Sequence, residues 1–192
     1  IASTLDKIAT EIRELQRPEI DELAEPFEKA KQVGSSTMPH KRNPELCERV
    51  CGLAKIMRSH TIPALENVPT WHERDLTQTS AERFIIPESC ILIDYTLHLV
   101  TNILDGLVVN ETRMRKNLEF TQGRNMSEAA MISLVSKGMS RQEAHELLRQ
   151  LTVRSETERQ PFKKALLENK TVKAKLGEKE IDHALNPRNY LG

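Results

Sequence analysis

Apolar residues recur every three or four positions along most of this chain, which is the spacing of a helix that buries one face. The pattern is clearest after Pro44, where Leu46, Val50, Leu53 and Met57 keep a four-three-four spacing. Such a seam is typical of a helix packed nearly parallel to others in a bundle. No segment shows the sustained alternation of a β-strand, so we predict an all-α fold.

Long helices are expected in the first part of the chain. One starts at the first residue, where the only cap is a weak one at Ser3 with Asp6. We therefore expect the chain to begin inside or just before a helix of a longer protein. The second long helix has Asn43 as its N-cap and Pro44 at its first position. Pro63 is expected to bend or end that helix.

A third long helix is expected from about Ser80 to Leu107, with a wide apolar face. The residues of this face are Phe84, Ile91, Tyr95, Leu99, Ile103 and Leu107. The longest apolar run, Ile91 to Val100, is interrupted by Asp94 and His98 and is too short to span a bilayer. We therefore expect a soluble protein with no membrane partner.

Shorter and better capped helices are expected in the last part of the chain. Asn110 starts one of them, and Ser140 with Glu143 forms a capping box for another. This change in helix length divides the chain into two expected domains. Residues 1–112 are expected to be part of a central helical bundle, and residues 113–192 to form a smaller C-terminal helical domain.

Charge and cysteine content exclude several classes of partner. Lys plus Arg and Asp plus Glu number 28 each, so the formal net charge is zero and no overall field attracts nucleic acid. Cys47, Cys51 and Cys90 show no C-x-x-C spacing, which argues against a disulfide framework or a zinc site. We interpret Cys47 and Cys51 as small buried hydrophobes, and the protein as cytoplasmic, with no metal ion.

The segment from Gly34 to Pro44 carries the chemistry that the sequence offers. It places two hydroxyls, two fixed cations and an amide side chain just ahead of a helix N-terminus. Free backbone N–H groups, the helix dipole and Lys41 predict an anion site that contains a hydroxyl. These parts suit the removal of a proton from a carbon next to a carboxylate, because donors already in place must hold the resulting dianion. A solvated, capped loop or a phosphate site without chemistry is the alternative.

This segment resembles the signature G-S-S-x-M-P-x-K-x-N of the fumarase/aspartase superfamily. Its extension to His40, Arg42 and Pro44 resembles the version found in adenylosuccinate lyases. The resemblance covers essentially the whole chain, including the closing Leu185-Asn186-Pro187 and Tyr190. It implies the helical fold of that superfamily.

The resemblance also implies roles for particular residues of the signature segment and the helix after it. These are Ser35, Ser36, Met38, Lys41, Asn43 and Glu48. Ser35 would be the base that takes the Cβ proton of the substrate. Lys41 and Asn43 would hold the succinyl carboxylates, and Glu48 would orient a histidine from another part of the assembly.

A second block, residues 71–83, resembles the phosphate-binding part of the same family. The implied phosphate contacts are Arg74, Thr79 and Arg83. Many relatives have serine where Thr79 stands, which keeps the hydroxyl. Paired guanidinium groups suit a phosphate dianion better than lysines do. Surface salt bridges of these arginines with Glu73 and Glu82 are the alternative.

The resemblance implies a lyase that eliminates fumarate from adenylosuccinate, and from the succinylated carboxamide intermediate of purine biosynthesis, without a metal or organic cofactor. It implies a homotetramer with shared active sites and a general-acid histidine in a segment upstream of residue 1. None of the chain's own histidines matches it: His40, His60, His72, His98, His145 and His183. A carboxymuconate cycloisomerase and a non-catalytic helical assembly module are the competing hypotheses.

Overall fold

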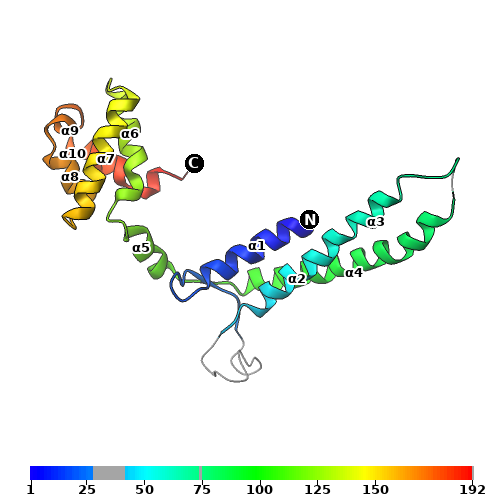
Figure 1. Cartoon of the computed structure of the whole chain (residues 1–192). Helices are drawn as coiled ribbons and strands as arrows, with labels where there is room; N and C mark the ends of the chain where they lie inside the picture. The colour runs from blue at the N-terminus through cyan, green and yellow to red at the C-terminus, as the bar shows by residue number, and fades with distance from the viewer. Residues whose placement is uncertain (28–41, 74, 192) are drawn as a thin grey trace. The chain divides into compact units, whose positions relative to one another are not determined.

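The computed structural model describes residues 1–27, 42–73 and 75–191 (Figure 1). The chain folds as two compact units, Ile1–Met114 and Arg115–Gly192. Helices make up most of both units, so the predicted all-α class is confirmed. The domain roles expected on either side of residue 112 stay predictions.

Long helices build the first unit. Its elements are α1 (Ala2–Leu15), β1 (Leu23–Ala24), α2 (Glu45–Ser59), α3 (Thr61–Glu66), α4 (Thr77–Asp105) and β2 (Val108–Val109). Helices α1, α2 and α4 pack against one another, and α3 continues along α4 (Figure 1). Val50 and Ile103 are central to the core between the three long helices.

A short strand pair was not predicted from the sequence. Strand β1 pairs with β2 in an antiparallel register that places Leu23 opposite Val109. Two residues are too few to show an alternating pattern, so the sequence carries no indication of this pair. The guanidinium of Arg113 adds a hydrogen bond from its Nε to the carbonyl of Ile20 (3.0 Å). The connector after α1 is therefore tied to β2 and to α5 (Glu111–Glu119), which follow α4.

The predicted start of the first helix is confirmed, because α1 begins at Ala2. The weak cap expected at Ser3 is wrong, because Ser3 lies inside the helix. Helix α2 begins at Glu45, and Pro44 rather than Asn43 is the residue that flanks its first turn. The two wrong caps, Ser3 and Asn43, come from assigning a cap by residue type alone.

Proline has the predicted effect on the second long helix. Helix α2 ends at Ser59, and Pro63 lies inside the short helix α3 that follows. The proline ring clashes with the carbonyl four residues earlier, which belongs to Ser59. Helix α2 therefore ends at Ser59, the residue whose carbonyl the ring of Pro63 would meet.

The buried face of α2 differs from the predicted seam. Cys47 and Cys51 are buried, which confirms their interpretation as small hydrophobes. Val50 is buried as well, but Leu53 and Met57 are only partly covered. Because α1 lies against α2, the cysteine side of α2 forms the contact within this unit, and part of the predicted seam stays accessible.

Helix α4 exposes much of its predicted apolar face. Leu99 and Ile103 are buried, whereas Phe84 is 76% and Ile91 68% exposed. In the part of the chain that the structure describes, α4 is also the one helix that is long and apolar enough to cross a membrane by length and composition. Large exposed apolar side chains in one region mark a contact surface.

Apart from the helix Arg141–Thr157, which has 17 residues, the helices of the second unit are short, and they surround a core of their own. Its elements are α5 (Glu111–Glu119), which begins in the first unit, η1 (Arg124–Met126), α6 (Ser127–Ser136), α7 (Arg141–Thr157), α8 (Phe162–Glu168), α9 (Lys170–Lys175), α10 (Glu178–Leu185) and η2 (Pro187–Asn189). Phe162, Leu134 and Leu166 lie at the centre of the core.

The predicted caps of α5 and α7 are confirmed. Asn110 accepts the N–H of Arg113 on its side-chain oxygen (3.1 Å). Ser140 Oγ accepts the N–H of Glu143 (3.2 Å), and the carboxylate of Glu143 accepts the N–H of Ser140 (3.2 Å). The reciprocal pair satisfies two backbone donors that the helix itself cannot satisfy.

We expect Ser140→Ala to lower the free energy of unfolding of the second unit by about 1 kcal/mol, because the N–H of Glu143 loses its acceptor. Urea unfolding followed by far-ultraviolet circular dichroism measures the change. Gln142→Ala, at an exposed position in the same turn, is the control and should change the free energy by less than about 0.5 kcal/mol. Equal effects of the two substitutions would show that the capping box contributes nothing.

Candidate functional site

The structure describes four of the predicted site residues. Asn43, Glu48, Thr79 and Arg83 are described, and all four belong to the first unit. The other five lie outside the described residues: Ser35, Ser36, Met38, Lys41 and Arg74. The geometry therefore covers the helix that follows the signature segment and the start of α4.

The chain on either side of residues 28–41 is held by side-chain contacts. The guanidinium carbon of Arg42 lies 5.1 Å from the ring centroid of Phe27, within the range of a cation–π interaction. Asn43 follows directly, and its carbonyl accepts the N–H of Glu45 (2.9 Å). Glu48 lies exposed on the first turn of α2, so its carboxylate is accessible to another group.

The sequence predicted free backbone N–H groups at the N-terminus of α2 that would bind an anion, and this part of the prediction is wrong. Glu25 is 4% exposed, and its carboxylate accepts the N–H groups of Leu46 (3.2 Å) and Cys47 (3.0 Å). The N–H of Glu48 donates to the carbonyl of Pro44 (2.8 Å), and that of Glu45 is already paired. All four donors of the first turn are therefore taken. A substrate anion there has to be held by side chains.

Burial and the neighbouring carboxylate also make the Cys47 thiol a poor nucleophile. Burial, with the charge of Glu25 beside it, raises the pKa of Cys47 to about 12. The thiolate, not the thiol, is the nucleophile and metal ligand. Among the described residues no group of histidine, cysteine, aspartate and glutamate is placed to hold a metal ion.

The second half of the site lies at the beginning of α4. Thr79 and Arg83 are four residues apart on this helix, so they lie on the same face. Arg83 is exposed and forms no ion pair with any described residue, including Glu73 and Glu82. The salt bridges that were the alternative explanation for Arg83 are therefore not formed within the described residues.

The hydroxyl of Thr79 has an unmet capacity for hydrogen bonding. Its Oγ1 is shielded from solvent and has no partner in the described parts of the chain. Buried polar atoms are paired in most proteins, so an orphan of this kind needs an explanation. A ligand or a neighbouring chain at this end of α4 would supply the missing partner.

Asp75 caps the N-terminus of α4. Its carboxylate accepts the N–H of Thr77 (2.9 Å) and that of Trp71 (3.3 Å). The Thr77 hydroxyl also donates to this carboxylate, and it is the largest cause of the lowered pKa of Asp75. The residues that precede the predicted phosphate contacts are thus fixed to the start of the helix.

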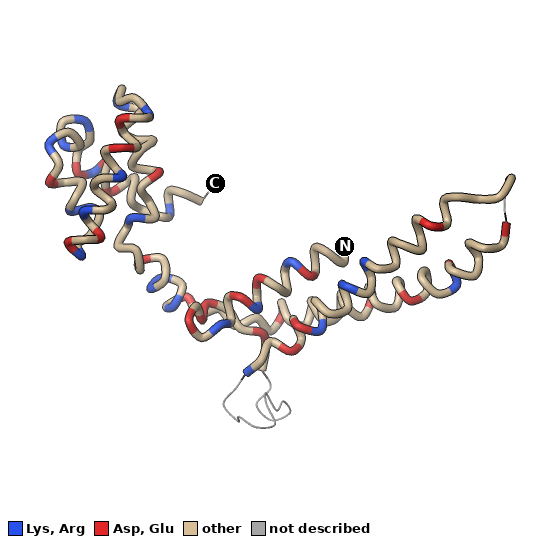
Figure 2. Tube along the Cα trace, in the orientation of Figure 1, with Lys and Arg blue, Asp and Glu red and all other residues tan. Residues whose placement is uncertain are grey.

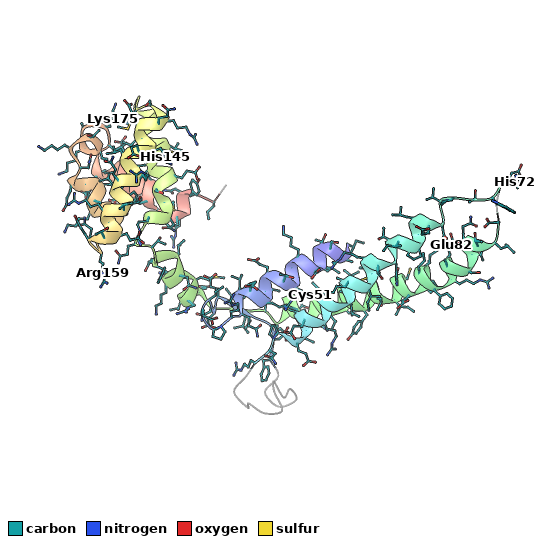
Figure 3. The ribbon with its side chains drawn as sticks, in the orientation of Figure 1. Cys51, His72, Glu82, His145, Arg159 and Lys175 are labelled. Carbon is teal, nitrogen blue, oxygen red and sulfur yellow. The ribbon has the colours of Figure 1, made fainter. Side chains whose placement is uncertain are left out.

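One chain does not bring the two halves of the site together. Asn43 lies before α2, whereas Thr79 and Arg83 lie near the start of α4, at the end where Figure 3 labels His72 and Glu82. Helices α2 and α3 run from Glu45 to Glu66 between these two ends (Figure 1). At about 1.5 Å per residue, the helical segment from Glu45 to Glu66 separates the two halves by roughly 30 Å.

A group of three polar side chains that the sequence did not indicate joins His60, between α2 and α3, to Ser89 and Glu88 on α4. His60 Nδ1 is 2.8 Å from Ser89 Oγ, and His60 Nε2 is 3.5 Å from a carboxylate oxygen of Glu88. The residue types are those of a catalytic triad, but Ser89 lies in the interior of α4. Backbone N–H groups in a helix interior are already paired, so no donors remain for an oxyanion. The group links the junction of α2 and α3 to α4.

Two family matches cover different parts of the chain. Residues 1–57 match the family described as "Lyase", and residues 123–192 match the family described as "Adenylosuccinate lyase C-terminus". Solved structures are similar over the whole chain. A 3-carboxy-cis,cis-muconate lactonizing enzyme from Pseudomonas putida is 34% identical with a TM-score of 0.80, and the chain covers 41% of it. A fumarate lyase from a Mesorhizobium species is 28% identical with a TM-score of 0.81, at the same coverage.

Curated relatives named adenylosuccinate lyase are more similar in sequence, and each aligns with 100% of this chain. The identity is 47% for Methanothermobacter thermautotrophicus, 48% for Aquifex aeolicus and 50% for Pyrococcus abyssi. The chain spans 43%, 44% and 42% of the length of these relatives. It therefore belongs to the adenylosuccinate lyase family of the fumarase/aspartase superfamily and corresponds to the C-terminal portion of its members.

Proposed function

We propose that the full-length protein is an adenylosuccinate lyase that eliminates fumarate from adenylosuccinate to give AMP. The same chemistry would release fumarate from the succinylated carboxamide intermediate of purine biosynthesis. The observation that carries the proposal is the identity of 45–50% to adenylosuccinate lyases along the whole chain. The exposed Arg83, unpaired within the described residues, supports a substrate that carries a phosphate.

In the proposed reaction Ser35 takes a proton from Cβ of the succinyl group. Lys41 and Asn43 hold the carboxylates, which accept the negative charge as the proton leaves. The bond between Cα and the purine nitrogen then breaks, and its electron pair goes to that nitrogen. A histidine from another part of the full-length protein, oriented by Glu48, supplies the proton that the nitrogen needs.

The remaining residues bind parts of the substrate that do not react. Ser36 and Met38 would line the succinyl group, and Arg74, Thr79 and Arg83 would hold the nucleotide phosphate. Neither a metal ion nor an organic cofactor takes part, since each step is a proton transfer or the cleavage of a bond to nitrogen. Fumarate release by the full-length enzyme in the presence of a chelator tests the reaction, and an enzyme that released none would refute it.

The active site would be shared between chains of a homotetramer. One chain separates Asn43 from Arg83 by roughly 30 Å of helix, whereas the succinyl group and the phosphate belong to one small molecule. A site that uses both residues therefore needs them from different copies. The exposed apolar face of α4 supplies a surface for such copies, since it includes Phe84 and Ile91.

A soluble, cytoplasmic tetramer also accounts for the charges on α4 better than a membrane does. Asp94 and Glu88 are exposed on this helix, and an exposed carboxylate in the bilayer is costly. Charges of both signs occur in both units (Figure 2), and the formal net charge of the chain is zero, so no overall field attracts nucleic acid. The free thiols of the chain suit a reducing compartment.

Mixed tetramers test the shared site. We expect co-expressed Ser35→Ala and Arg83→Ala chains to regain activity, because about a quarter of the sites would combine an intact Ser35 from one copy with an intact Arg83 from another. Each variant alone should be nearly inactive at low substrate concentration. Ser35→Ala mixed with Lys41→Ala is the matched control, since these two residues belong to one segment of one copy and no site regains both. Verified mixed tetramers without recovered activity would contradict a shared site.

A further inference from the structure

Glu25 is a buried carboxylate that connects two distant parts of the first unit. It follows β1, and its two oxygens accept the N–H groups of Leu46 (3.2 Å) and Cys47 (3.0 Å) in the first turn of α2. It is 4% exposed, so water does not replace these bonds. A negative charge at this position also complements the positive end of the helix dipole.

Glu25 is itself held by two other helices. The side-chain oxygen of Gln16, at the end of α1, accepts the backbone N–H of Glu25 (3.0 Å). Pro26 lies against Gly106 at the end of α4, where an added Cβ would come within 2.7 Å of the proline ring. Contacts with α1 and with the end of α4 therefore fix the backbone around Glu25. The carboxylate of Glu25 in turn fixes the first turn of α2.

We propose that Glu25 is a positioning residue for the active site. Through Leu46 and Cys47 it sets the direction in which α2 begins, and so places Asn43 just before the helix and Glu48 on its first turn. Its charge also occupies the positive end of α2, so the substrate carboxylates meet side chains rather than helix N–H groups. The inference rests on the proposed lyase function, because Asn43 and Glu48 are assigned their roles there.

Substitutions of Glu25 in the full-length enzyme test the role. Glu25→Gln keeps the shape but offers one acceptor and places an NH₂ group against an N–H donor. We expect kcat per folded enzyme to fall by about tenfold to a hundredfold, as expected for catalytic groups displaced by about 1 Å. Hydrogen exchange of the Leu46 and Cys47 amides should accelerate, while exchange at Val50 should stay unchanged. Glu14→Gln, at an exposed carboxylate paired with Arg17 on α1, is the matched control.

Added carboxylate gives a readout that a merely structural role would not move. In Glu25→Ala, acetate should enter the vacated space at the α2 N-terminus and restore kcat several-fold, with no effect on wild type or on Ser35→Ala. Glu25 variants that fold and keep kcat within twofold of wild type would overturn the role and leave the lyase function intact. Failure of every Glu25 variant to fold would make Glu25 a folding residue and would equally overturn it. A wild-type enzyme that releases no fumarate would instead refute the proposed function.

Discussion

Ser35→Ala in the full-length enzyme is expected to lower kcat for adenylosuccinate by at least about a thousandfold, because the group that accepts the Cβ proton is lost. Substrate affinity should stay within about tenfold of wild type, since Lys41, Asn43 and the phosphate contacts remain. Steady-state kinetics of fumarate release give kcat, and equilibrium binding of substrate to the inactive variant gives the affinity. A loss of this size in kcat alone is the signature of a group that acts in the transition state.

The neighbouring hydroxyl is the control for this assignment. Ser36→Ala removes the same atoms one residue later, and we expect a much smaller loss of kcat, because Ser36 is assigned to binding. Equal losses for the two substitutions, or a larger loss for Ser36→Ala, would show that the base has been assigned to the wrong serine. The pair therefore tests the residue-by-residue transfer of the family signature to this chain.

Local patterns predicted the helices of the second unit well. The capping box of Ser140 and Glu143 and the cap at Asn110 depend on residues three positions apart, so both can be read from the sequence. The helices themselves follow from apolar spacing. These features require no knowledge of what lies elsewhere in the fold.

Contacts between distant segments explain what the sequence did not predict. The cap of α2 is Glu25, more than twenty residues before the amides it binds, and in the sequence it is only the last of an acidic stretch. Strands β1 and β2 are likewise brought together by the packing of α1 and α4. The predicted free amides at the start of α2 were wrong for this reason, because the acceptor comes from tertiary structure.

The sequence also did not predict which apolar residues of α4 stay exposed. The spacing of Phe84, Ile91, Leu99 and Ile103 predicts one continuous apolar face on α4, but only the last two are buried within the chain. The pattern indicates that a face is covered and does not say by which chain. The same ambiguity applies to the site. The family resemblance assigns Asn43 and Arg83 to one active site, but the sequence does not say that the two residues lie far apart within one chain.

Arg83→Ala is expected to remove most of the preference of the enzyme for a phosphorylated substrate. Arg83 would contact the nucleotide phosphate, which is remote from the bond that breaks, so the contact is made in both the ground state and the transition state. Its loss should raise KM, and should lower kcat as well if the phosphate anchors the succinyl group beside Ser35. The two kinetic constants together show how far phosphate binding is coupled to the reacting end.

The measurement is the ratio of kcat/KM for adenylosuccinate to kcat/KM for the dephosphorylated nucleoside. In wild type the ratio should correspond to roughly 3–6 kcal/mol, the value of two charged hydrogen bonds, and Arg83→Ala should lose much of it. Arg83→Lys keeps the charge without the paired donors and should fall between the two. Arg154→Ala, which removes an arginine already paired with Glu158 (2.8 Å), is the control and should leave the ratio unchanged. A wild-type enzyme with no preference for the phosphate would remove the role of Arg74, Thr79 and Arg83, and would make a carboxymuconate cycloisomerase the better hypothesis, because that reaction has no phosphate to bind.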